Sequence, residues 1–245
     1  MADLSFMRFE LNGKDAETFL QGQVTVEVSK LDDSSYQATA ISDLKGRIQF
    51  GLWLNRHSAE HIEVIISSDQ SEALQAHIKK YGAFSKFQLS PAEPVYPAIV
   101  NGKASFNHTD DSTSVEAWQQ TAISQGQAWI TAATAGLFQP QELRLHQRGG
   151  VDYDKGCYLG QEIIARLWFR AKPKHWLHLI QASMGDVPAA GQQLDNDIQV
   201  VNAIADNNAQ GWQALVVAKP AALAASIYQV LDLPEGLNGD VARPK

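Results

Sequence analysis

One stretch of the chain alternates so cleanly between apolar and polar side chains that it restricts the fold to an antiparallel β architecture. Within residues 46–56, every second position is apolar, at Ile48, Phe50, Leu52 and Leu54. Successive side chains of a strand point to opposite faces, so this period of two predicts a strand with one buried face. Such strands are typical of antiparallel sheets that face solvent on one side.

The segments around this strand mix helix and strand signals. We expect strands over 5–11 and 61–67 and a helix that ends at Gly82. Ser67 and Gln70 form the pattern of a capping box, which predicts the start of that helix. The order strand, helix, strand, strand, strand, helix favours an α+β fold over a parallel βαβ array.

The character of the chain changes after residue 171. Four short strand-like runs follow at regular spacing, separated by Gly, Pro, Asp and Asn; they are 176–182, 198–205, 211–218 and 226–233. This spacing predicts a small all-β barrel. We therefore expect two domains, an α+β body over 1–170 and a C-terminal β-barrel over 171–245.

Composition narrows the classes of function. A single cysteine among 245 residues excludes an internal disulfide framework and any Cys-only metal or cluster site within one chain. The formal net charge of -7 argues against a broad grip on nucleic acid. Charges interrupt the first ten residues, and the most apolar stretch, 128–138, is too short to cross a bilayer. We expect a cytoplasmic, monomeric protein without a membrane span or a metal site.

Residues 149–166 concentrate side chains that can carry chemistry. Closely spaced glycines allow the backbone to approach a ligand, and Cys157 falls in the loop before a predicted helix over 161–168. A thiol near a helix N-terminus and two residues from Lys155 is expected to favour its reactive thiolate form. The alternative is that Cys157 is a small buried hydrophobe and that the glycines only shape a turn.

The run Lys155-Gly-Cys-Tyr-Leu-Gly-Gln-Glu162, followed by Ala165-Arg166, resembles the K-G-C-Y-x-G-Q-E signature of the YgfZ-type folate-binding family. That family is similar to the aminomethyltransferase of the glycine cleavage system. The signature is highly specific, because only one of its positions is free. Other stretches agree with the family in the same order; they are 13–16, 19–25, 43–47, 81–86 and 138–141.

The resemblance implies an α+β body of two interwoven parts, a C-terminal β-barrel and a central cleft that accepts tetrahydrofolate. It also implies a role in supporting iron–sulfur client enzymes, including the one that thiomethylates certain tRNAs. Cys157 is then the reactive candidate, assisted by Lys155. Aromatic contacts to folate are implied at Trp118 and Phe6, since an aromatic face stacks on a pterin. Without the resemblance, Trp118 is better explained as a core residue.

The signature supplies the remaining folate-binding candidates. They are Tyr158, Gln161, Glu162 and Arg166. Gln161 or Glu162 is expected to hydrogen-bond the amidine-like edge of the pterin, which offers adjacent donors.

Two departures from related patterns bear on activity. Phe50 and Gly51 stand where the transferases carry a catalytic Asp pair, and a phenylalanine cannot accept a proton. Arg144 stands where the family commonly has Asn. We therefore expect a binding protein rather than a functional aminomethyltransferase. The alternatives are a folate-dependent one-carbon transferase or demethylase and a direct tRNA-binding factor.

A basic cluster with interleaved aromatic residues follows the signature. It comprises Arg166, Trp168, Phe169, Arg170, Lys172, Lys174, His175 and Trp176. The cluster is explained most simply as a helix end and linker, with cations that complement the helix dipole. It can also attract the glutamate tail of a folate, or bind single-stranded RNA by charge and stacking. The net negative charge opposes the RNA interpretation, so direct nucleic-acid binding is not expected.

Overall fold

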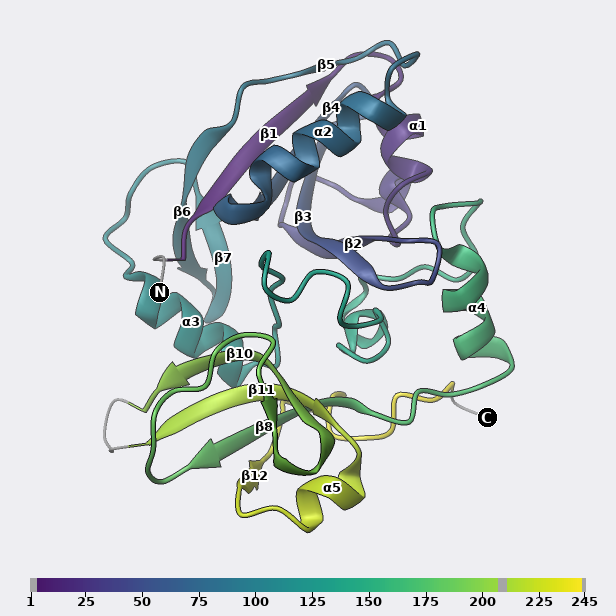
Figure 1. Cartoon of the computed structure of the whole chain (residues 1–245). Helices are drawn as coiled ribbons and strands as arrows, with labels where there is room; N and C mark the ends of the chain where they lie inside the picture. Colours follow the sequence, from purple (N-terminus) through teal and green to yellow (C-terminus); the bar gives the residue numbers. More distant parts are fainter. Residues whose placement is uncertain (1–3, 207–210, 244–245) are drawn as a thin grey trace.

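The computed structural model describes residues 4–206 and 211–243, which form two antiparallel sheets (Figure 1). The larger sheet has the order β2-β3-β4-β1-β6-β7, with β5 paired to β1, and the smaller has the order β12-β8-β11-β10-β9. The strands of the larger sheet are β1 (Phe6–Asn12), β2 (Gln37–Ser42), β3 (Ile48–Ser58), β4 (His61–Ser67), β5 (Gln88–Leu89), β6 (Glu93–Val100) and β7 (Lys103–Asn107). Those of the smaller are β8 (Trp176–Ala182), β9 (Gln193–Leu194), β10 (Ile198–Ala205), β11 (Trp212–Ala218) and β12 (Gln229–Leu231).

Two helices cover one face of the larger sheet. They are α1 (Ala16–Gln21) and α2 (Ser71–Tyr81), and Figure 1 shows α2 lying across the strands. Leu74 and Ile78 of α2 pack against Leu52, Leu54 and other apolar strand residues in one buried cluster. The helix ends at Gly82 as predicted, where the Gly82 N–H donates to the carbonyl of Ile78 at 2.8 Å.

The opposite face of the larger sheet is buried against the rest of the chain. Helix α3 (Val115–Ser124), the coil that follows it and the smaller sheet all pack there. One apolar cluster contains Trp53 from β3, Trp118 from α3, and Leu177 and Leu215 from the smaller sheet. The two sheets therefore share a core. The division of the chain near residue 171 remains a proposal about domains, because this core spans both sides of it.

Because both faces of the larger sheet are covered, the prediction that β3 has one buried face and one solvent-exposed face is wrong. Trp53 and Asn55, on the face assigned to solvent, are only 4% and 7% exposed. Ile48 joins the cluster of Trp53 instead of the cluster of Leu52, and the β2–β3 register shifts nearby, between Ile41 and Ser42. The strand is present where the alternation indicated, but both of its faces are buried.

The predicted capping box is also wrong. A short 3-10 turn, Ser68–Gln70, precedes α2, and no side chain caps the helix. The Ser67 hydroxyl instead donates to the carbonyl of Ile130 at 2.9 Å, and the Gln70 amide donates to the carbonyl of Gln49 at 2.9 Å. Both side chains are used to tie distant segments together, which a local sequence pattern cannot indicate.

The C-terminal strands follow the predicted runs closely, with two differences. The fourth run contains only the short strand β12, because α5 (Pro220–Ala224) and a turn precede it. The two-residue strand β9 adds to the sheet edge beyond β10 and was not predicted. Helix α4 (Gln161–Phe169) lies between the two sheets in the sequence, directly after the signature loop. Within the described residues, no helix is both long and apolar enough to cross a membrane.

Candidate functional site

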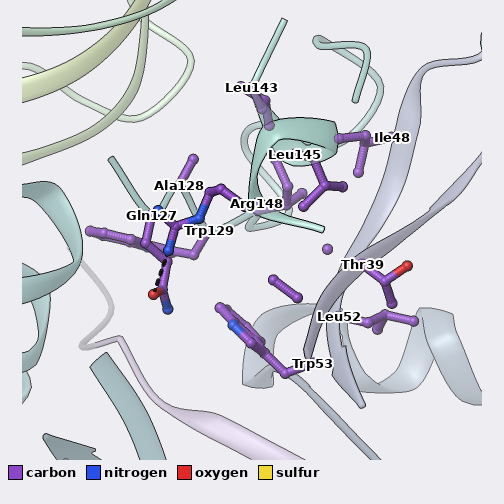
Figure 2. A pocket seen from close by; sticks show the side chains of 13 residues that line it. Thr39, Ile48, Leu52, Trp53, Gln127, Ala128, Trp129, Leu143, Leu145 and Arg148 are labelled. Atoms are coloured by element: carbon purple, nitrogen blue, oxygen red, sulfur yellow. Dashed lines mark hydrogen bonds between the residues drawn. The ribbon is translucent and has the colours of Figure 1, made fainter. Parts of the chain in front are cut away.

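A small cavity lies where β2 and β3 meet the coil 127–130 and the turn 143–148 (Figure 2). It encloses about 30 Å³, which is room for one or two water molecules. It is lined by Ala38, Thr39, Ile48, Gly51, Leu52, Trp53, Gln127, Ala128, Trp129, Ile130, Leu143, Leu145 and Arg148. We call it the central cavity. Its lining comes from segments far apart in the sequence, and none of the site residues predicted from the sequence is part of it.

Arg148 is the charged side chain of the central cavity, whose lining contains no carboxylate. Its Nη1 donates to the carbonyl of Gln125 at 2.7 Å, and its Nη2 donates to Oε1 of Gln127 at 3.2 Å (dashed in Figure 2). Burial lowers the pKa of the guanidinium below its usual value, but an arginine stays protonated. A positive charge held only by neutral amide oxygens is suited to a ligand that presents acceptors.

Two tryptophans line the central cavity, and sequence reasoning missed both. Trp53 and Trp129 are each 4% exposed. The indole N–H of Trp53 has no hydrogen-bond acceptor in the part of the chain that the structure describes. A buried donor without a partner costs about 1–3 kcal/mol, so it marks a point where a ligand acceptor is favoured. The available signal was a tryptophan on the face of β3 that the alternation assigned to solvent.

Trp129 is held in the wall of the central cavity by the smaller sheet. Its backbone N–H donates to Oδ1 of Asn202 at 3.0 Å, and Nδ2 of Asn202 donates to the Trp129 carbonyl at 2.9 Å. Asn202 lies at the point where the β10–β11 register shifts, which follows a bulge after Val200. The Asn202 side-chain amide thus pairs with the Trp129 backbone in the way that the backbone of a neighbouring strand would.

Phe6 and Trp118 lie one layer behind the central cavity. Trp118 is fully buried, and its Nε1 donates to the carbonyl of Ser105 at 2.8 Å. Its ring centroid lies 6.1 Å from that of Trp53 and 5.4 Å from that of Trp129. Phe6 is 1% exposed and packs against Trp118 with a centroid distance of 4.9 Å. These two residues support the cavity tryptophans from behind without lining the cavity. The folate contact that the resemblance implies for them is a prediction that competes with the assignment of Trp53 and Trp129 to the ligand.

Lys155 of the signature anchors its loop to the body of the protein. Its Nζ donates to the carbonyls of Val24 and Val26 at 2.7 and 2.6 Å, and lies 4.9 Å from the ring centroid of Tyr158. Burial lowers the pKa of Lys155 to about 8. Because the ammonium is engaged by these two carbonyls, the expected assistance to the Cys157 thiolate has no support in this geometry.

Gly160 of the signature allows α4 to dock against the turn 43–47. Its φ of 80° lies in the left-handed region, and a Cβ there would approach the carbonyl oxygen of Asp43 to 2.4 Å. Gly46 meets the same helix, with Ile163 3.1 Å from the position of a Cβ. Two of the stretches that carry the family resemblance therefore lie against each other, and their glycines are explained by packing.

Cys157 and the preceding Gly156 have no packing role in the signature loop. The Cys157 thiol is exposed, and a Cβ on Gly156 would meet nothing within 4 Å. The interpretation of Cys157 as a small buried hydrophobe is therefore wrong. Gln161 is half-buried and donates to the Lys155 carbonyl at 3.4 Å, whereas Glu162 and Arg166 are exposed on α4. The structure groups these residues on the signature loop and α4, and none of them lines the central cavity.

Phe50 and Gly51, where the resemblance implies an Asp pair in the transferases, are both surrounded by packed side chains in this chain. Gly51 lines the central cavity, and a Cβ there would lie 2.9 Å from Cβ and Cγ1 of Ile130. Phe50 is buried beneath α2, with its ring edge-on to His77 at 5.4 Å. Ile130 thus occupies the space that a side chain at residue 51 would need.

Arg144 is a core residue and not a polar group of the central cavity. It is 1% exposed, and its Nε donates to the carbonyl of Leu177 at 2.9 Å. Its Nη1 donates to Oε1 of Gln147 and to the carbonyl of Gly239, each at 2.9 Å. Burial lowers the pKa of this guanidinium to about 10. The side chain ties the turn beside the cavity to β8 and to the end of the described chain.

The basic cluster after the signature is partly neutralised. Lys172 lies 3.3 Å from a carboxylate oxygen of Asp240, and His175 lies 3.5 Å from one of Glu142. Phe169, which is 48% exposed, has the Arg243 guanidinium over its ring at 4.9 Å. Across the described residues, no group of three or more His, Cys, Asp or Glu side chains could hold a metal ion.

The arrangement of two antiparallel sheets with a shared core matches that of a known fold. A solved structure of the glycine cleavage system aminomethyltransferase T from Bartonella henselae superposes with a TM-score of 0.68 at 12% identity, covering 88% of this chain and 76% of that one. The predicted α+β fold class is thereby confirmed. No family model matches the chain.

Sequence comparison places the chain in a family. It is 30% identical over 236 residues to the tRNA-modifying protein YgfZ of Escherichia coli O157:H7, in an alignment that covers 76% of this chain and 72% of the relative. The Shigella sonnei protein of the same name is 29% identical with the same coverage. The chain belongs to the YgfZ family, as the signature indicated.

Proposed function

We propose that the protein binds tetrahydrofolate in the central cavity and that it supports the iron–sulfur enzymes needed for tRNA modification by thiomethylation. The observation that carries the folate proposal is the composition of the cavity wall. Trp53 and Trp129 offer aromatic surfaces, Arg148 offers a cation without a carboxylate partner, and the Trp53 N–H lacks an acceptor. A pterin is a flat heteroaromatic ring with acceptors and donors along its edge, so this set of groups fits it.

The central cavity is too small for tetrahydrofolate unless part of its wall moves. Small-molecule sites usually enclose about 300–1,000 Å³, whereas the central cavity encloses about 30 Å³. Binding therefore requires the wall at 127–130 to move away from β3. Arg148 holds this wall through Gln125 and Gln127, and its donors become available to the ligand when those bonds break.

The absence of a carboxylate in the cavity lining supports binding over acid–base turnover. General acid–base catalysis needs a titratable group within hydrogen-bond reach of the reacting atom. Ile130 fills the position next to Gly51, where such a group would stand. The relatives are named tRNA-modifying proteins, which supports a link to tRNA modification.

Calorimetric titration with tetrahydrofolate tests the folate proposal. Saturable binding is expected, and Arg148→Gln should weaken it about tenfold, the loss of one charge-assisted hydrogen bond. Lys219→Gln is the matched control, because Lys219 is exposed directly after β11, outside every candidate folate contact, and should leave the affinity unchanged. No saturable binding of tetrahydrofolate or its one-carbon derivatives would refute the proposal.

Cys157 is the proposed contact with the iron–sulfur client enzymes. Its thiol is exposed on a loop that Lys155 anchors, so a partner can reach it. In cells, Cys157→Ala should lower tRNA thiomethylation and iron–sulfur enzyme activity while the purified variant keeps its folate affinity. Full thiomethylation by the variant would show that Cys157 has no part in the function.

A further inference from the structure

A second hollow lies on the opposite face of the larger sheet from the central cavity. It is a groove of about 580 Å³ between α2 and the segment 82–89. Figure 1 shows α2 at the top of the molecule. The lining of the groove combines apolar and polar side chains; it consists of Glu72, Gln75, Ala76, Ile78, Lys79, Gly82, Ala83, Ser85, Phe87 and Leu89. The segment overlaps the stretch 81–86, which carries part of the family resemblance, and the proposed folate site makes no use of it.

Phe84 stands beside this groove with its side chain 100% exposed. Its two neighbours in the chain, Ala83 and Ser85, both line the groove. Tyr81 is 47% exposed, and Nζ of Lys80 lies 5.0 Å from its ring centroid. The surface therefore presents two aromatic rings next to a hollow that is wide enough for a small molecule.

Four lysines lie on the same segments as these rings or on the loop that contacts them. They are Lys14, Lys79, Lys80 and Lys86, all exposed, and none forms an ion pair with any residue that the structure describes. Asp15 brings Lys14 beside Lys86, because its carboxylate accepts the Lys86 backbone N–H at 2.7 Å. Two of these lysines complement the dipole at the end of α2. The dipole explains neither the other two nor the exposed Phe84.

We propose that this surface binds a short single-stranded RNA segment. We call it the Phe84 patch and define it as Tyr81, Phe84 and the four lysines together with the groove. Lysines neutralise phosphates, and exposed aromatic rings stack on bases without regard to sequence. An acidic peptide would use the lysines but has no comparable use for a fully exposed ring. The proposal does not rest on folate binding, because the two sites lie on opposite faces of the sheet.

The net charge of the chain limits this contact. At -7 overall, the protein repels nucleic acid except at the patch, so only a few phosphates are engaged. Three or four phosphate contacts predict that log K falls with log salt with a slope of about -2 to -3. Binding should therefore be weak and should disappear as salt rises.

Fluorescence anisotropy of a labelled oligouridylate of about ten nucleotides, titrated with the full chain, tests the proposal. Between about 50 and 200 mM salt, we expect saturable binding with this slope. Phe84→Ala should weaken binding roughly 5- to 150-fold, as for other stacked bases. Replacing both Lys79 and Lys86 by Gln should reduce the slope by about 1.4. These side chains are exposed, so the variants should fold, which circular dichroism checks.

Matched controls lie on the C-terminal sheet and its flanks. Ile227→Ala removes a side chain that is 93% exposed, and Lys219→Gln removes an exposed lysine, so both should bind as the unaltered chain does. The proposal is overturned if no saturable binding occurs at the lowest salt or if Phe84→Ala has no effect. It is equally overturned if polyglutamate competes as well as unlabelled RNA, or if Arg166→Gln with Arg170→Gln abolishes binding while the patch variants retain it.

Discussion

Replacing Trp53 by Phe should separate ligand binding from folding stability. In the ligand-free protein, the buried indole N–H lacks an acceptor among the described residues, at a cost of about 1–3 kcal/mol that phenylalanine removes. The smaller ring also loses packing against Phe6 and Phe106, a cost of similar size. These two terms oppose each other. We expect the free energy of unfolding to stay within about 1 kcal/mol of the unaltered chain.

The same substitution removes a donor that we assign to the ligand. A single hydrogen bond contributes about 0.5–1.5 kcal/mol net, so the Kd for tetrahydrofolate should rise roughly 2- to 13-fold. Calorimetry is the appropriate measurement, because it does not depend on tryptophan fluorescence, which the substitution itself changes. Urea unfolding followed by circular dichroism gives the stability.

Trp118→Phe is the matched control, because Trp118 lies one layer behind the central cavity. There the indole N–H is satisfied by the Ser105 carbonyl at 2.8 Å, so the lost hydrogen bond and the lost packing both destabilise. We expect a loss of about 2–4 kcal/mol in stability and an unchanged Kd. If Trp118→Phe weakens folate binding as much as Trp53→Phe, then Trp118 touches the ligand and the cavity assignment is wrong. An equal loss of stability in both variants would contradict the unpartnered N–H of Trp53.

Three further predictions follow from the contacts described. Lys155→Met should destabilise the protein by about 2–3 kcal/mol, because two buried hydrogen bonds are lost. Cys157→Ser changes an exposed site and should alter stability by less than about 0.5 kcal/mol. Urea unfolding measures both free energies. Gly51→Ala should cost about 1–3 kcal/mol and reduce tetrahydrofolate binding, because the added Cβ lies 2.9 Å from Ile130 side-chain atoms; melting and calorimetry measure both effects. Stability should fall as pH drops from about 6.5 to about 4. Burial lowers the pKa of three histidines in the folded protein to about 4. Between these pH values the histidines bind protons only in the unfolded chain, which acidification therefore favours. The three histidines are His77, His146 and His178. Urea midpoints across this range should give a flatter profile for His178→Phe, and an unchanged profile would contradict the burial of that imidazole.

Local signals explain what the sequence could predict. The helix expected over 161–168 appears as α4 (Gln161–Phe169), one residue longer than the prediction. The strands β8 and β10 likewise match predicted runs that are bounded by turn residues. Such features depend on neighbours in the chain. They made the fold class, and through the signature the family, accessible from the sequence.

The cavity depends on contacts between distant segments, which no local pattern contains. Lys155 donates to the carbonyl of Val24, 131 residues away in the chain, and this hydrogen bond holds its ammonium inside the body of the protein. Trp53 faces a cavity only because the coil 127–130 covers β3. The sequence therefore identified the signature loop but could not show which tryptophans face a ligand and which lie behind them.

The paired hydrogen bonds between Trp129 and Asn202 have a consequence for communication between the two sheets. A ligand that enlarges the central cavity must displace the wall that contains Trp129, and this wall is bonded to β10 at 3.0 and 2.9 Å. Either β10 moves with it or both bonds break, so occupancy of the cavity changes the free energy of the smaller sheet. Coupling of this kind is reciprocal. A molecule that binds to the smaller sheet and resists the displacement therefore lowers the affinity of the cavity for its ligand by the same factor.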